Sequence, residues 1–136
     1  MGLKEKRAIQ EFHDNDFQAF KKELANWVGA DIPIEVNWES MALEEQSHLY
    51  KDAFSKVYFQ PIVDACKAIG GDDMGRKALN EGLKKIVVAN TKGASNPEAA
   101  IGFSGGTLTI DHKPTTNIGD VGARAKVVQK VLEAGL

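Results

Sequence analysis

The tripeptide Asp111-His112-Lys113 contains the most reactive combination of residue types in this chain. A carboxylate, an imidazole and an amine at the end of a strand could transfer protons as general acids or bases. Successive side chains along a strand point to opposite faces, however, so Asp111 and His112 do not form a dyad by being adjacent. We interpret the tripeptide as a polar strand exit before Pro114, with His112 as the acid–base candidate if the protein is an enzyme.

Other residue types that bind metals or act as nucleophiles are scattered. The three histidines, His13, His48 and His112, lie in different elements, and none is paired at the i, i+3 or i, i+4 spacing of a helical metal site. The single cysteine, Cys66, excludes an internal disulfide, and it falls in the apolar stripe of a helix, where a thiol is inert. We therefore predict no catalytic residue, no metal site and no cofactor.

The glycine-rich stretch at 102–106 contains neither GxGxxG nor GxxxxGK[ST] and opens no helix, so it is not a phosphate-binding loop. Gly105-Gly106 instead predicts a two-residue type I′ turn between two strands. A glycine inside a strand, such as Gly102, predicts a bulge or the close approach of another backbone. In the hairpin register one face carries Ile101, Phe103, Leu108 and Ile110, and the other carries Gly102, Ser104, Thr107 and Thr109.

Four stretches of the chain have the composition of strands. The apolar run at 85–90 predicts a central strand covered on both faces. Alternation at 34–38 predicts a strand with one polar face. With the hairpin strands near 99–104 and 107–111, the stretch from 85 onwards reads as a three-stranded meander, so we expect about four strands in a mostly antiparallel sheet.

Helical periodicity accounts for the rest of the chain. Residues 3–29 predict either two helices broken near 13–16 or one helix with a weak centre. The longest apolar stripe runs from Leu49 to Ile69 and contains Pro61, where we expect a kink or the start of a second helix. Further helices are predicted at about 73–83 and 118–135.

The overall composition is that of one soluble domain spanning residues 1–136, with 43% hydrophobic and 26% charged residues. A net charge of −2 argues against a general nucleic-acid binder, which needs a basic excess. No apolar run is long enough to span a membrane, and the opening MGLKEKR lacks the apolar core of a secretory signal. We therefore predict a cytoplasmic protein without a membrane partner.

These elements predict a two-layer α+β fold, in which the N-terminal, central and C-terminal helices cover one face of the sheet. The other face would be a polar surface with Val87 or Ala89 as a small apolar centre. We place seven candidate binding residues on it, with His112 on the same side as the hydroxyl groups: Glu35, Asn37, Gly102, Ser104, Thr107, Thr109 and His112.

Three functions are compatible with this surface. The first is a non-catalytic interaction or accessory protein that could form a homodimer, because no catalytic constellation is present. Its aromatic residues would be available for an interface: Trp27, Trp38, Tyr50 and Tyr58. The second is a small-molecule or anion binder that uses the hydroxyl groups and the space above Gly102. The third is an enzyme of unknown class in which His112 or Asp111 transfers protons and Glu35 assists.

Overall fold

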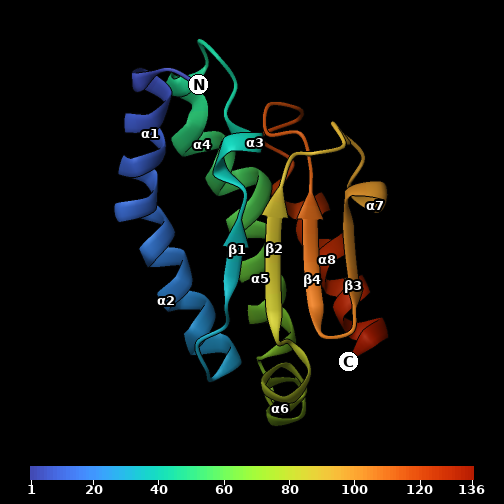
Figure 1. Ribbon diagram of the computed structural model, residues 1–136. Coiled ribbons are helices and arrows are strands. Elements are labelled where there is room, and N and C mark those ends of the chain that lie inside the picture. The colour runs from blue at the N-terminus through green and yellow to red at the C-terminus, as the bar shows by residue number, and fades with distance from the viewer.

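The computed structural model describes residues 1–136 and shows a mixed four-stranded sheet with helices layered on one of its faces (Figure 1). The order of the strands in the sheet is β1-β2-β4-β3. The first three of these run parallel, and β3 joins the edge antiparallel to β4. The predicted α+β class with four strands is confirmed. The strands are β1 (Ile34–Val36), β2 (Lys85–Ala89), β3 (Ile101–Ser104) and β4 (Thr107–Asp111).

The prediction of a mostly antiparallel sheet is wrong, because two of the three strand pairings are parallel. Strand β2 does not continue into a meander with β3. It pairs instead with β4, so that Ile86 lies beside Leu108 and Val88 beside Ile110. A hairpin can join a sheet through either of its strands. Here β4, whose Leu108 and Ile110 are fully buried, takes the interior position, and β3 with its Gly102 takes the edge.

Two strands are shorter than predicted because short helices adjoin them. Strand β1 ends at Val36, and α3 (Trp38–Met41) follows. The Oδ1 atom of Asn37 caps α3 by accepting the Ser40 N–H at 3.2 Å. Strand β3 begins at Ile101 because α7 (Pro97–Ala100) occupies the residues before it.

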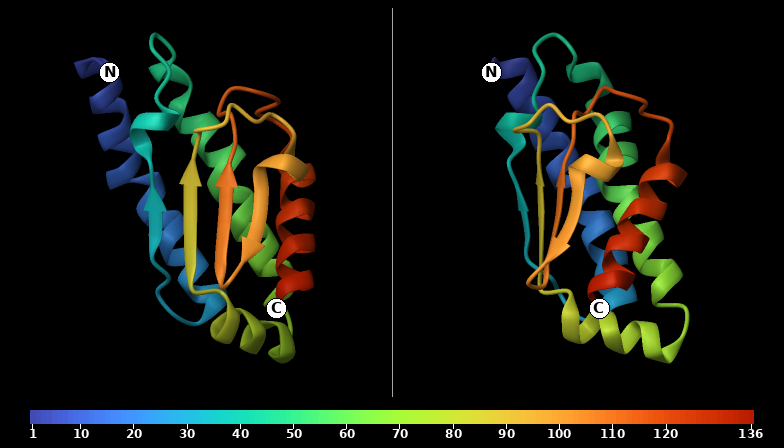
Figure 2. Two further views of the ribbon diagram at one scale, coloured as in Figure 1. Left: turned by 45° about the vertical axis from the view of Figure 1, so that its right-hand side comes forward. Right: turned by 90° about the vertical axis from the view of Figure 1, so that its right-hand side faces the viewer.

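The helix layer contains α1 (Leu3–Asp14), α2 (Asp16–Val28), a central stretch and α8 (Val121–Gly135). Figure 2 shows α2, the central stretch and α8 on the same side of the sheet, with α1 extending past the β1 edge and the opposite face uncovered. Helix α6 (Asp73–Gly82) lies across the end of the sheet at which β2 begins (Figure 1). The central stretch consists of the 3₁₀ turn η1 (Ser47–Leu49), α4 (Tyr50–Phe54), the π-helical turn η2 (Ser55–Phe59) and α5 (Gln60–Ile69).

Both expected interruptions of the helices have a local cause. The interruption at Pro61 takes the form of η2, directly before it, and α5 begins at Gln60. Pro61 thus stands in the first turn of α5, where the absence of its N–H is tolerated. The break within residues 3–29 falls at Asn15, whose φ of −115° and ψ of −84° are not helical.

The hairpin turn has the predicted geometry. Gly105 and Gly106 have φ angles of +58° and +81°, as a type I′ turn requires, and Ser104 lies opposite Thr107. A Cβ atom on Gly106 would lie 3.2 Å from the carbonyl oxygen of Gly82. Gly102, by contrast, has open space around it, so neither a bulge nor a close backbone explains this residue.

We predict that Gly106→Ala lowers the free energy of unfolding by about 1–2 kcal/mol, because alanine is disfavoured at positive φ and would crowd Gly82. Gly102→Ala is the matched control, and it should leave stability unchanged or raise it by up to about 1 kcal/mol. Urea unfolding of the two variants measures both effects. A Gly102→Ala protein as unstable as Gly106→Ala would show that the space above Gly102 is not open.

Candidate functional site

The uncovered side of the sheet, which we call the open face, holds most of the polar side chains predicted to lie together. Thr109 has Val87 beside it on one strand and Gly102 on the other. Thr107 lies in the same way between Lys85 and Ser104. The open face consists of Glu35, Lys85, Val87, Ala89, Gly102, Ser104, Thr107, Thr109 and Asp111.

Two of the predicted site residues lie at the margin of this surface. Glu35 is exposed on edge strand β1, and its carboxylate pairs with the Lys85 ammonium at 2.8 Å. Asn37 lies beyond the end of β1, where its side chain caps α3. Glu35 therefore contributes charge to the rim of the open face, whereas the Asn37 side chain stabilises the start of α3.

The prediction that His112 lies on the open face is wrong. Counting in twos from Thr107 and Thr109 leads to Asp111, and His112 points with Ile110 into the helix layer. It is 0% exposed. Its Nδ1 lies 2.7 Å from the carbonyl oxygen of Lys113, which can only accept, so Nδ1 carries the hydrogen and Nε2 does not. Nε2 is buried and has no hydrogen-bond partner.

His112 belongs to a buried polar cluster with Tyr58 and Arg124. The Tyr58 hydroxyl donates to the His112 carbonyl oxygen at 2.5 Å. Arg124 on α8 is only 1% exposed, and its guanidinium donates to the carbonyl oxygens of Thr116 and Asn117 at 2.6 Å each. His112 is fully buried, and the hydrogen bonds of Arg124 tie the 116–118 segment to α8.

Burial controls the ionisation of this cluster. It lowers the pKa of His112; the hydrogen bond to Lys113 opposes this shift, and the positive charge of Arg124 adds to it. Burial raises the pKa of the Tyr58 hydroxyl, and the charge of Asp111 adds to that shift. At neutral pH the imidazole and the phenol are therefore both uncharged.

Asp111 anchors the loop that follows β2. Its carboxylate accepts hydrogen bonds from the Thr91 N–H at 2.7 Å, the Thr91 hydroxyl at 2.5 Å and the Lys92 N–H at 3.3 Å. Burial raises the pKa of Asp111, but the hydrogen bonds from Thr91 and Lys92 outweigh it and leave the pKa below its usual value. Asp111 therefore remains ionised, and its hydrogen bonds to Thr91 and Lys92 tie the start of the loop after β2 to the sheet.

A hollow of about 440 Å³ lies where the open face meets this loop and α7. Its lining includes Thr107 and Thr109, together with one basic residue, Lys92, and one acidic residue, Asp111. Its volume falls in the range of small-molecule sites. Four of the seven residues predicted from the sequence line it: Gly102, Ser104, Thr107 and Thr109.

Other candidate chemistry is not assembled by the fold. No group of three or more His, Cys, Asp and Glu side chains could hold a metal ion. Cys66 is fully buried, and burial raises the pKa of its thiol to about 12, so it is an inert core residue at neutral pH. No helix of the chain is long and apolar enough to cross a membrane.

Comparisons find no family model, no curated protein and no solved structure that matches this chain.

Arg124 is the polar residue that the sequence analysis missed. It stands at helical spacing from Val121, Val127 and Val128, so it lies on the side of α8 that faces the core. A charged residue inside an apolar stripe is the signal that could have marked it for burial.

The buried, uncharged state of His112 predicts a dependence of stability on pH. Below about pH 6.5 the unfolded chain takes up a proton on this imidazole, whereas the folded chain does so only at lower pH. The free energy of unfolding should therefore fall as the pH drops from 7.5 to 5.0. Once the pH is below both pKa values, the loss amounts to about 1.4 kcal/mol for each unit by which they differ.

Urea unfolding of wild type and His112→Gln at both pH values isolates this contribution. The variant should be less stable than wild type at pH 7.5, because the glutamine packs less well, but it should lose less stability on acidification. An equal loss in the two proteins would contradict the assignment.

Proposed function

We propose that this protein is a non-catalytic interaction protein that forms a homodimer through its open face. One observation carries the proposal: the three parallel strands are covered by helices on one side only (Figure 2). Parallel strands occur almost entirely in sheets that are buried on both faces. A second layer is therefore expected on the open face, and a second copy of the chain can supply it.

The distribution of charge on the open face favours a second copy over a strongly charged partner. The centre is neutral, with Val87 beside Thr109, whereas the charges of Glu35, Lys85 and Asp111 lie at the edge or the ends of the strands. In a two-fold interface the residues near the axis meet their own copies, so a neutral centre avoids repulsion between like charges. At the rim Lys85 forms an ion pair with Glu35, and the positive charge of Lys92 lies near enough to Asp111 to lower the pKa of its carboxyl.

The dimension of the open face predicts a weak dimer. The four strands are three to five residues long. With strands about 4.8 Å apart and a rise of about 3.3 Å per residue they cover roughly 300 Å². A stable interface buries about 800 Å² per partner. The aromatic residues do not enlarge the surface, since Tyr50 and Tyr58 are buried and Trp38 packs in the helix layer. We therefore expect a dissociation constant on the order of 100 μM.

Sedimentation equilibrium of wild type and Thr109→Arg tests the proposal. Arginine at the centre of the open face would place two like charges against each other at the two-fold axis, so the variant should stay monomeric at concentrations at which wild type dimerises. Ala123→Arg, an equal change at an exposed position of α8, is the control and should dimerise as wild type does. A wild type that is monomeric at 1 mM protein, on the order of ten times the expected constant, would overturn the proposal.

The hollow beside α7 favours a second candidate, a small-molecule binder. Because one basic residue, Lys92, and one acidic residue, Asp111, line the hollow, their charges sum to zero, and the hollow suits an uncharged ligand with several hydroxyl groups better than an anion. Hydroxyl groups that line a concave site recognise such ligands by hydrogen bonds.

A thermal-shift screen with monosaccharides and other neutral polyols at millimolar concentration tests this second function. A ligand that binds in the hollow should raise the melting temperature of wild type, and Thr107→Val and Thr109→Val should each reduce that rise. An equal rise in wild type and both variants would place the ligand elsewhere.

A further inference from the structure

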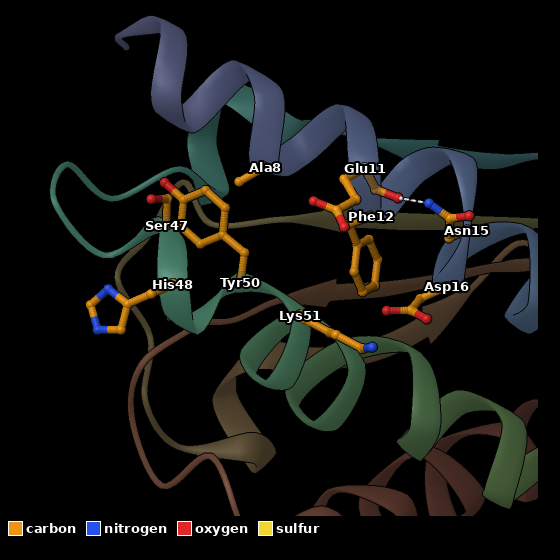
Figure 3. A pocket seen from close by; sticks show the side chains of 9 residues that line it. All are labelled: Ala8, Glu11, Phe12, Asn15, Asp16, Ser47, His48, Tyr50 and Lys51. Atoms are coloured by element: carbon orange, nitrogen blue, oxygen red, sulfur yellow. Dashed lines mark hydrogen bonds between the residues drawn. The ribbon is translucent and has the colours of Figure 1, made fainter.

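The largest hollow of the molecule, about 480 Å³, lies in the helix layer, away from the open face. Figure 3 shows it between α1 and the beginning of α2 on one side and η1 and α4 on the other. Its volume is sufficient for a small organic molecule. It is lined by Ala8, Glu11, Phe12, Asn15, Asp16, Ser47, His48, Tyr50 and Lys51.

Two aromatic rings form its floor and are fixed by the core. Phe12 and Tyr50 are each only 3% exposed. The Tyr50 ring stacks on Phe54 at a centroid distance of 4.8 Å, and Phe12 meets Phe54 edge-on at 5.4 Å. The Tyr50 hydroxyl donates to the carbonyl oxygen of Leu43 at 2.9 Å. The floor is therefore apolar, rigid and already in place before a ligand arrives.

The walls carry charges of both signs. In Figure 3 the carboxylates of Glu11 and Asp16 lie on either side of the Phe12 ring, Lys51 extends along the opposite wall, and His48 points away. Neither Glu11 nor Asp16 forms an ion pair with any cation of the chain, and Lys51 forms none with an acid. The break between α1 and α2 sets the upper wall, where the Asn15 side chain donates to the Glu11 carbonyl oxygen at 2.8 Å.

We propose that this hollow binds a small zwitterion, an ammonium group and a carboxylate joined by a short carbon chain. The ammonium lies between the Glu11 carboxylate and the aromatic floor, where an ion pair and a cation–π contact both stabilise it. The carbon chain covers Phe12, and the carboxylate reaches Lys51. This site is separate from the open face and does not depend on the proposed dimer.

The proposal is tested by adding three ligands with four carbon atoms each to the full chain: 4-aminobutyrate, butylamine and butyrate. Amide NMR shifts monitor the binding of each. We expect saturable shifts in α1 and α4 for 4-aminobutyrate, weaker binding of butylamine and none of butyrate. Each exposed ion pair contributes a modest amount, so removing one should weaken binding about three- to fivefold.

Charge-removing variants assign the two ends of the ligand. Glu11→Gln should weaken both amines, whereas Lys51→Gln should lower 4-aminobutyrate to the affinity of butylamine and leave butylamine unchanged. Glu23→Gln, an exposed acid of α2 outside the hollow, is the control and should have no effect. Butyrate binding as tightly as 4-aminobutyrate, no saturable shift with any probe, or an unchanged affinity in Glu11→Gln would each overturn the proposal.

Discussion

The parallel pairing of β2 and β4 determines where the remaining elements lie. The side chains of these two strands are packed against helices on one side of the sheet and uncovered on the other. Each of the four residues on the packed side contributes about 2 kcal/mol by its burial. A slip of one residue would turn all of them outward, so this side fixes the register. These residues are Ile86, Val88, Leu108 and Ile110, all 0% exposed.

Because of the same pairing, the two adjacent residues at the end of β4, Asp111 and His112, contact different segments on opposite sides of the sheet. Because Asp111 lies beside Ala89, its carboxylate reaches the backbone of Thr91, which follows two residues later, and ties down that loop. His112 points to the other side, where its carbonyl accepts from Tyr58 and its imidazole lies buried near Arg124. A pair that looks like an acid–base dyad in the sequence thus anchors two loops on opposite sides of the sheet. The open face is left to Val87, the threonines and Gly102.

Features that depend on neighbouring residues were predicted correctly from the sequence. The pairing of strands that lie far apart in the sequence was not. The register of the hairpin follows from Gly105-Gly106 and alternation, and the break at Asn15 follows from its competing polar side chains. Which hairpin strand pairs with β2 depends on relative burial across the whole sheet, and no local pattern encodes that. The misplacement of His112 was avoidable, because alternation from Thr109 already assigns it to the core side. The hollow of Figure 3 is lined by residues of α1 and α4 that are about forty positions apart in the sequence, and no sequence motif marks it.

The proposed function requires that the open face be an interface between two copies of the chain. Amide NMR spectra recorded from low micromolar to millimolar protein test it residue by residue. We expect concentration-dependent shifts that cluster on Val87, Gly102, Ser104 and Thr109 and leave the helix layer unchanged. Spectra that do not change with concentration, or shifts confined to α1, α5 or α8, would contradict it.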